Sequence, residues 1–419
     1  MRMSFNGGRL EGTLSPPPSK SHTHRAIFLA SMANGRSMIS NPLISEDTLA
    51  TIRASESMGA LIHRESDKIV IDGGELHAPS DAIDVANSGT TMRIFTGLAS
   101  MFDTPVKITG DSSIKKRPMK PLLDALSQVG VECSSDDGKP PVEIKGSNPG
   151  GSVHINGSMS SQFITSLLIV SPMLPNDSNI VISGKIVSEP YLDVTTSMMK
   201  KFGASTKKER QTYTVKGNTG YTPFDYHVPS DFSSAAFPLV AGAMGGSVTA
   251  LGLDLEDPQG DRRILDILRD AGADILVKEG SVTVSKNTLQ GMELDIGDIP
   301  DLFPILSVLF CTASGTTRLY GAPQLRFKES DRIRTTVTML KAIGADIEGT
   351  DDGCVIHGKK ELSGGYIENE GDHRIMMAAA VASLVCKDPV TMENTECCSV
   401  SYPSFINDMK SIGMIAEEY

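Results

Sequence analysis

One pattern recurs six times along the 419-residue chain: an amphipathic helix, a glycine, a strand, a turn and a second strand. A glycine directly after a helix is typical of a left-handed C-terminal cap, because glycine reaches positive φ without a side-chain clash. The glycines of the six copies lie about 70 residues apart, and such even spacing indicates an internal repeat. They are Gly59, Gly130, Gly203, Gly272, Gly344 and Gly413.

Each copy also contains a polar cluster followed by an almost entirely apolar stretch, which predicts a helix buried on all sides. A second helix follows a polar or proline-marked turn, so each copy reads β-α-β-α-β-β. The chain length indicates about two domains, hence three repeats per domain with the apolar helices at each domain centre. These helices are expected to start near Ser21, Ser88, Ser161, Phe232, Leu302 and His373.

The two ends of the chain indicate how the repeats are divided between the two domains. The sixth copy stops after one strand, at Tyr419, and the first residues, MRMSFNGGRLEGTL, look like the missing partner strand. We therefore expect the N-terminal residues to pair with the last repeat. The predicted domains are residues 16–226, and residues 1–15 together with 227–419, with the proline run at Pro16 as the crossing between them.

Composition excludes several classes of protein. The formal net charge of -12 argues against a nucleic-acid partner, so an anionic ligand would need local cations. The longest apolar run, IMMAAAVASLVC, is shorter than the roughly 20 residues of a membrane span, and the N-terminus lacks a signal-peptide core. No metal-ligand spacing joins the six cysteines to His22, His24 or His373, and no phosphate-loop or dinucleotide motif is present. We expect a cytoplasmic protein with no membrane segment, metal or cofactor.

The first half of the chain concentrates cations and hydroxyls at three equivalent helix starts. Helix N-termini carry partial positive charge, so Lys20 and Arg25 are unfavourable there unless an anion lies close by. Ordinary caps with solvated cations are the alternative. Three equivalent clusters, each short of acids, favour an anion site. The clusters are Lys20, Ser21 and Arg25; Asn87, Ser88, Gly89, Thr90 and Thr91 with Arg93; and Ser160, Ser161 and Gln162, with Arg117 added from a loop.

The equivalent helix starts of the second half carry Asp231, Asp301 and Asp372. For Asp231 and Asp372 we predict ordinary N-caps. The stretch LRFKESDRI places five charged side chains in seven positions, a pattern that is usually a solvated helical face. Here it opens a second helix, where the first half places a cation. Glu329 among these cations is therefore a candidate acid–base group, and Arg374, just before the most apolar helix, is a candidate site residue.

The motifs resemble those of the 5-enolpyruvylshikimate-3-phosphate (EPSP) synthase family. They occur in order from residue 19 to about residue 403, namely SKSHTHR, NSGTTMR, KKRPM, SSQF, SEPYLDVT, IPD, FKESDR, DHR and SYP. The resemblance implies a two-domain inside-out α/β barrel of six βαβαββ repeats, with the substrates bound between domains that close on them. It also implies a transferase of the shikimate pathway, on the route to chorismate and the aromatic amino acids. Such an enzyme moves the enolpyruvyl group of phosphoenolpyruvate to the 5-hydroxyl of shikimate 3-phosphate and releases phosphate.

The same resemblance implies residue roles and a monomeric enzyme acting on two small molecules. Asp301 would be the base near the attacked hydroxyl, Glu329 the proton donor to the enol carbon, and Lys20 a third catalytic group. Shikimate 3-phosphate would be held by Lys20, Ser21, Arg25, Ser160, Ser161, Gln162, Ser188, Tyr191, Asp301, Gln324 and Lys328. Phosphoenolpyruvate would be held by Lys20, Asn87, Gly89, Arg117, Gln162, Arg332 and Arg374.

Some features depart from the family pattern or leave alternatives open. Val400 stands where many members have a Lys, which puts one phosphate contact in doubt, and Gln324 stands where Asn is common. A sister enzyme that uses a UDP-amino sugar carries a Cys in its mobile loop, and the matching loop GDSSIKKRPM has none. A non-catalytic anion-binding scaffold would not need Glu329 and Asp301 as well. An RNA-end-processing enzyme is disfavoured by the acidic net charge and the lack of a nucleotide motif.

Overall fold

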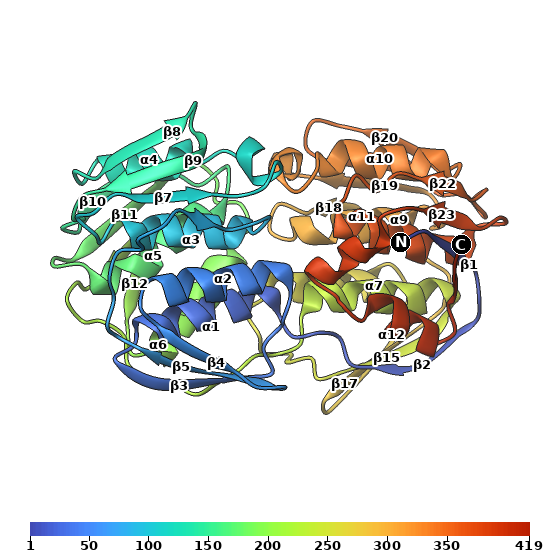
Figure 1. Cartoon of the computed structure of the whole chain (residues 1–419). Coiled ribbons are helices and arrows are strands. Elements are labelled where there is room, and N and C mark those ends of the chain that lie inside the picture. The colour runs from blue at the N-terminus through green and yellow to red at the C-terminus, as the bar shows by residue number, and fades with distance from the viewer. The chain divides into compact units, whose positions relative to one another are not determined.

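A computed structural model describes residues 1–419, and the chain folds as two compact units. The central unit is Pro18–Val228, and the terminal unit joins Met1–Pro17 to Pro229–Tyr419. Each unit has a hydrophobic core of its own. Both ends of the chain lie in the terminal unit (Figure 1). No helix is both long and apolar enough to cross a membrane.

The central unit contains three repeats and one additional short strand. Its elements in chain order are α1 (Lys20–Met32), β3 (Gly35–Ser40), α2 (Glu46–Ser57), β4 (Leu61–Arg64), β5 (Lys68–Gly73), β6 (Ile83–Asp84), α3 (Gly89–Ala99), β7 (Val106–Thr109), the 3₁₀ turn η1 (Ile114–Lys116), α4 (Lys120–Ser127), β8 (Glu132–Asp136), β9 (Lys139–Lys145), β10 (Gly151–Asn156), α5 (Ser161–Val170), η2 (Ser171–Met173), β11 (Ser178–Ser183), α6 (Pro190–Lys201), β12 (Thr206–Glu209), β13 (Thr212–Val215) and β14 (Tyr226–His227).

The terminal unit contains the other three repeats and the first two strands of the chain. Its elements are β1 (Met3–Asn6), β2 (Leu10–Leu14), α7 (Phe232–Gly245), β15 (Gly246–Leu251), η3 (Gly260–Arg263), α8 (Ile264–Asp270), β16 (Asp274–Lys278), β17 (Ser281–Ser285), β18 (Glu293–Asp295), η4 (Pro300–Leu302), α9 (Phe303–Phe310), β19 (Thr316–Tyr320), η5 (Pro323–Phe327), α10 (Arg332–Ala342), β20 (Asp346–Gly349), β21 (Cys354–His357), β22 (Gly365–Ile367), α11 (His373–Ala382), η6 (Ser383–Val385), β23 (Val390–Met392), η7 (Thr395–Val400), α12 (Phe405–Ser411) and β24 (Ile415–Glu418).

Each repeat builds one four-stranded sheet, which gives six sheets in all. In the third sheet of the central unit, β10 and β11 are parallel, whereas β11–β13 and β13–β12 are antiparallel. The parallel pair is joined through α5, as a β-α-β crossover requires, and the antiparallel pair closes as a hairpin. The other sheets follow the same plan, so the predicted six-repeat α/β fold is confirmed.

The N-terminal residues serve two sheets, whereas the sequence analysis assigned all of them to the last repeat. Strand β1 lies between β23 and β24, with Phe5 opposite Val390 and Ala416. Strand β2 instead pairs in parallel with β15, with Leu10 opposite Gly246. In the central unit, β14 pairs in parallel with β3. The first repeat of each unit therefore takes its first strand from a distant part of the chain.

The helices occupy the places that the repeat predicted. The first helix of each repeat starts within one residue of its expected position, and nearly every residue of α3, α7 and α11 is buried. In the central unit, Figure 1 shows α1, α3 and α5 enclosed by the sheets. All six glycines after the second helices have positive φ, between 87° and 109°. A residue with a Cβ would be strained at each, which explains why the pattern is so regular.

Candidate functional site

Three helix starts of the central unit are linked by polar side chains. Helices α1, α3 and α5 begin at Lys20, Gly89 and Ser161. Ser88 caps α3 by accepting from the backbone N–H of Thr91, and Ser160 caps α5 by accepting from that of Gln162. The caps satisfy only some of the backbone N–H groups at the helix starts. The remaining N–H groups favour binding of an anion.

Lys20 has an acidic partner that the sequence analysis missed. Its ammonium group contacts Asp47 Oδ2 at 2.9 Å, and Asp47 lies in the first turn of α2. The expectation that this cluster is short of acids is therefore wrong. The motif SED at the start of α2 was the available signal, but only the packing of α1 against α2 brings Asp47 to Lys20. The ion pair orients the ammonium and reduces the unfavourable effect of a cation at a helix start.

Arg25 lies one turn inside α1, and its side chain is almost fully buried. The guanidinium donates to Thr195 Oγ1 at 2.8 Å and to the Ser21 carbonyl at 2.9 Å, with a longer contact of 3.4 Å to the Tyr191 carbonyl. Burial lowers the pKa of Arg25 to about 10, so the group stays cationic near neutral pH. Arg25 thus joins α1 to α6 and adds a positive charge between them.

Ser188 and Tyr191 stand at the start of α6 beside this guanidinium. The Tyr191 N–H donates to the Ser188 carbonyl at 3.2 Å. Ser188 is buried and has φ of 54°, a left-handed conformation that is costly for a residue with a Cβ. Strained residues of this kind concentrate at ligand-binding positions.

Gly89 is surrounded by two guanidinium groups. A Cβ at this position would lie 2.7 Å from Nη1 of Arg117 and 2.8 Å from Nη1 of Arg93, so only glycine fits without moving them. Arg117 donates to Asn87 Oδ1 at 2.9 Å, and Arg93 donates to Gln162 Oε1 at 2.6 Å. The structure thus brings Asn87, Gly89, Arg117 and Gln162 together, as the sequence analysis expected for an anion site.

In the terminal unit, three cations converge on Asp301. Lys328 Nζ lies 3.3 Å and Arg332 Nη1 2.7 Å from Oδ1, and Arg374 Nη2 lies 3.3 Å from Oδ2. Burial acts to raise the pKa of Asp301, but Arg374, Lys328 and Arg332 outweigh it and hold that pKa well below the usual range. Asp301 lies in η4 just before α9, and in this structure it is a paired carboxylate.

Arg332 is the centre of this cluster, and 1% of its side chain is exposed. It contacts Glu329 Oε2 at 2.6 Å and Asp372 Oδ2 at 2.9 Å as well as Asp301. Burial opposes its charge, yet Asp372, Glu329 and Asp301 together raise the pKa of Arg332. Asp372 also accepts from the N–H of Arg374 and caps α11.

The two N-cap predictions are confirmed. Asp372 caps α11, and Asp231 caps α7 by accepting from the N–H of Ser234. Asp372 does more than cap, since it is also a direct partner of Arg332. No sequence signal distinguishes these two aspartates, because the second role depends on where α10 packs.

Asp261 is a further buried acid that the sequence analysis did not single out. It lies in η3, is fully buried and makes a short hydrogen bond with Ser233 Oγ. Burial, and then repulsion from Asp301, raise the pKa of Asp261 to about 7. A carboxyl group that changes charge near neutral pH therefore lies close to the Asp301 cluster.

Two predicted site residues of the terminal unit each have a buried side-chain atom without a hydrogen-bond partner in the protein: Nη1 of Arg374 and Oε1 of Gln324. The other amide atom of Gln324 donates to the Gly297 carbonyl at 2.9 Å. Both residues were predicted to bind substrate. A ligand oxygen at the guanidinium and a ligand hydroxyl at the amide would complete their hydrogen bonding.

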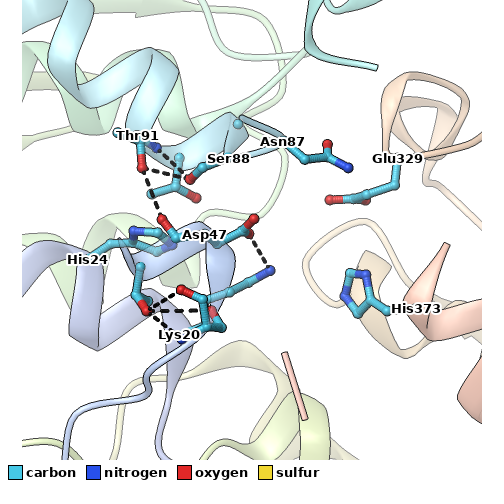
Figure 2. Close-up of polar contacts among 12 residues, drawn as sticks. Lys20, His24, Asp47, Asn87, Ser88, Thr91, Glu329 and His373 are labelled. Carbon is cyan, nitrogen blue, oxygen red and sulfur yellow. Dashed lines mark hydrogen bonds and ion pairs between the residues drawn. The ribbon is translucent and has the colours of Figure 1, made fainter. Parts of the chain in front are cut away.

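The histidines of the α1 motif are neutral structural groups. Burial, with Arg25 and Lys201, lowers the pKa of His22 to about 3, and burial lowers that of His24 well below its usual value. His24 lies near Lys20, Asp47 and the start of α3 (Figure 2). No group of three His, Cys, Asp or Glu side chains is arranged to hold a metal ion.

Comparison with known proteins identifies the family. The profile of the family described as EPSP synthase (3-phosphoshikimate 1-carboxyvinyltransferase) matches residues 5–409. The chain belongs to this family. EPSP synthases catalyse enolpyruvyl transfer in the shikimate pathway, and the chain is therefore a carboxyvinyltransferase.

Relatives and solved structures agree with this assignment. A 3-phosphoshikimate 1-carboxyvinyltransferase of Methanocorpusculum labreanum is 46% identical over 99% of both chains. One from Methanocaldococcus jannaschii is 42% identical, over 97% of this chain and 96% of its own. The solved EPSP synthase of Acinetobacter baumannii is 29% identical with a TM-score of 0.83 over 100% of both chains. The enolpyruvyl transferase NikO of Streptomyces tendae, at 16% identity and a TM-score of 0.80 over 99% of this chain and 98% of its own, shares the fold.

Proposed function

We propose that this EPSP synthase joins phosphoenolpyruvate to the 5-hydroxyl of shikimate 3-phosphate by addition followed by elimination. The hydroxyl oxygen bonds to C2 of phosphoenolpyruvate and gives up its proton, while C3 gains a proton and becomes a methyl group. The tetrahedral intermediate then loses a C3 proton and inorganic phosphate, which leaves an enolpyruvyl ether. Both substrates are multiply anionic, so the site must supply cations as well as acid and base groups.

The observation that carries the proposal is the cluster around Asp301 and Arg332. It combines three cations with three carboxylates in contact with them, and two of these, Asp301 and Glu329, are the proposed acid–base groups. A site that only bound anions would be weakened by several carboxylates that offset the charge of its cations. Acid–base chemistry on an anionic substrate needs both.

Asp301 is proposed as the base for the 5-hydroxyl. With Lys328, Arg332 and Arg374 on it, the carboxylate is a weak base, because its pKa is held low. When the substrate anions draw hydrogen bonds from Lys328 and Arg374, the carboxylate becomes more basic. Substrate binding itself would thus prepare the base.

Glu329 is proposed as the proton donor to C3, and Lys20 as a third catalytic group. Glu329 contacts Arg332, which holds its carboxyl group in place. In the elimination step C3 loses one of its three methyl protons, which the Glu329 carboxylate accepts, so one group acts first as acid and then as base. Lys20, oriented by Asp47, would balance the negative charge on the phosphate and carboxylate groups.

The remaining binding residues divide between the two substrates. We propose that phosphoenolpyruvate is held by Lys20, Asn87, Gly89, Arg117, Gln162, Arg332 and Arg374. The unpartnered Nη1 of Arg374 and the close approach of Arg117 to Gly89 support this set. We propose that shikimate 3-phosphate is held by Lys20, Ser21, Arg25, Ser160, Ser161, Gln162, Ser188, Tyr191, Asp301, Gln324 and Lys328. The strained Ser188 and the unpartnered Oε1 of Gln324 support that set.

A phosphate-release assay tests the reaction. Purified protein with both substrates and no added metal should release one phosphate per enol ether formed, detected by ³¹P NMR. A UDP-amino sugar in place of shikimate 3-phosphate serves as the control acceptor and should give no release. Folded protein that is inactive with shikimate 3-phosphate would contradict the proposal. Monomeric state and cytoplasmic location stay predictions from the sequence.

A further inference from the structure

Four buried polar side chains form a continuous hydrogen-bonded row in the central unit, which we call the hydroxyl row. His24 Nδ1 lies 2.6 Å from Thr51 Oγ1, which lies 2.7 Å from Thr91 Oγ1. Thr91 Oγ1 lies 2.6 Å from Ser88 Oγ. All four residues are fully buried. Figure 2 shows three of these residues, His24, Ser88 and Thr91, near the Lys20–Asp47 ion pair.

The row joins α1 and α3, which carry proposed phosphoenolpyruvate ligands, to α2, which carries Asp47, the ion-pair partner of Lys20. His24 stands one turn after Lys20 in α1, and Thr51 stands one turn after Asp47 in α2. Ser88 and Thr91 flank Gly89 at the start of α3. Each member is thus within one helical turn of a site residue, although none of the four is itself accessible.

The His24 end of the row fixes the direction of its first two hydrogen bonds. Nε2 of His24 is buried without a partner, and a bare ring nitrogen costs less there than an unsatisfied N–H. The proton of the neutral ring therefore belongs on Nδ1, which donates to Thr51. Thr51 then donates to Thr91, whose own proton can go to Ser88 Oγ at 2.6 Å or to the Asp47 carbonyl at 3.5 Å. Ser88 Oγ also accepts from the Thr91 N–H. Each hydrogen bond strengthens the next one, so the row couples the positions of α1, α2 and α3.

A change in this row would be transmitted to Gly89. The backbone at Gly89 lies so close to the guanidinium groups of Arg117 and Arg93 that a single Cβ would not fit. A small displacement of the start of α3 therefore changes the distance from that backbone to both cations. Such displacements weaken binding of a ligand held by several groups at once.

We propose that His24, Thr51, Thr91 and Ser88 are positioning residues that hold Lys20, Asp47 and Gly89 in the geometry needed for phosphoenolpyruvate. This inference rests on the proposed phosphoenolpyruvate ligands. Shikimate 3-phosphate shares Lys20 and takes Ser21 and Arg25 from α1, but its other proposed ligands lie at α5, at α6 and in the terminal unit, which the row does not join. Loss of the row should therefore affect one substrate more than the other.

Thr51→Val removes the central hydroxyl of the row at nearly constant volume. We expect the KM for phosphoenolpyruvate to rise about tenfold, with the KM for shikimate 3-phosphate changing less than about twofold. Thr51→Ser restores a hydroxyl and should recover most of the wild-type KM. The matched control is Thr96→Val, because Thr96 is a buried residue of α3 whose hydroxyl bonds only within its own helix, to Met92.

The outcomes separate the inference from the proposed function. The inference would be overturned if Thr51→Val and Thr96→Val had equal KM values for phosphoenolpyruvate. It would also be overturned if Thr51→Val raised the KM values for both substrates equally. If Thr51→Val does not fold, His24→Leu must give the same one-sided change in KM or the inference fails. An inactive wild-type enzyme would refute the proposed function instead. In that case the affinity for phosphoenolpyruvate is measured by calorimetry with shikimate 3-phosphate present. A loss of affinity in Thr51→Val alone supports the inference. Equal affinities in Thr51→Val and Thr96→Val refute it.

Discussion

The two units hold their arginines in different ways. In the central unit, Arg25 donates to a hydroxyl and to backbone carbonyls, Arg93 to an amide, and Arg117 to another amide. In the terminal unit, Arg332 is held by three carboxylates. Neutral acceptors fix a guanidinium without cancelling its charge, whereas carboxylates cancel the charge and have their own pKa values shifted.

This difference gives each unit a distinct task. The central unit offers oriented positive charge at helix starts, which suits binding of phosphate and carboxylate groups. The terminal unit offers carboxyl groups with shifted pKa values, which suits proton transfer. The units have the same repeat, so the division comes from side chains and not from topology.

Glu329→Gln provides the strongest test of the proton-transfer role of the terminal unit. The change keeps size and hydrogen bonding but removes the proton that the mechanism moves. We expect kcat to fall about 1,000-fold, within the usual range for a lost acid–base group. Substrate affinity, measured by calorimetry, should change little, because the cations remain.

A matched variant sharpens this result. Glu370 also accepts two hydrogen bonds from an arginine, Arg334, but that pair is largely exposed. Glu370→Gln should therefore leave kcat within about twofold of wild type, since exposed ion pairs contribute little. A kcat for Glu329→Gln close to that of Glu370→Gln would remove Glu329 from the mechanism.

Asp261 predicts a pH dependence of stability in the terminal unit. Its pKa is about 7 in the folded protein, above the ordinary value of 3.8, so the folded state binds more protons between these values. The contribution of Asp261 to the free energy of unfolding is therefore fully present below about pH 4 and is lost as pH rises to 7. The loss is about 4 kcal/mol.

Asp261→Asn should flatten this part of the stability profile. Urea unfolding at intervals between pH 4 and pH 8, for wild type and variant, measures the difference. Asp301 acts with the opposite sign, because its depressed pKa gives stability above the ordinary value that is lost in acid. Parallel profiles for the two proteins between pH 4 and pH 7 would show that Asp261 is not the titrating group.

Lys20→Met tests the anion-binding role of the central unit and has the smallest expected effect. It removes one cation and leaves Asp47 without its ion-pair partner, so we expect KM values to rise about tenfold or more. Lys120→Met, at an exposed pair with Asp124, is the control and should have no effect on KM.

A double variant separates the loss of the Lys20 cation from the effect of leaving the Asp47 carboxylate unpaired. In Lys20→Met with Asp47→Asn, the carboxylate that would repel substrate is gone as well. Partial recovery of KM would assign part of the loss to Asp47. An unchanged KM in Lys20→Met itself would count against the division of tasks between the units.

The sequence by itself determined the repeat, its six capping glycines and the helix starts, because these depend on local conformation and on hydrophobic period. It also predicted the N-caps Asp231 and Asp372, since a cap acts within its own turn. The site residues that match family motifs were named for the same reason: they occur in short, contiguous stretches.

Only the tertiary structure decided which of these residues touch. The ion pair of Lys20 with Asp47, the convergence of three cations on Asp301 and the hydroxyl row each join separate helices. The route of β2 to β15 instead of the last repeat is of the same kind. Such contacts depend on how helices and strands pack across long separations, which no local pattern of residues records. The pKa shifts follow from those contacts and from burial, so they too were beyond the sequence.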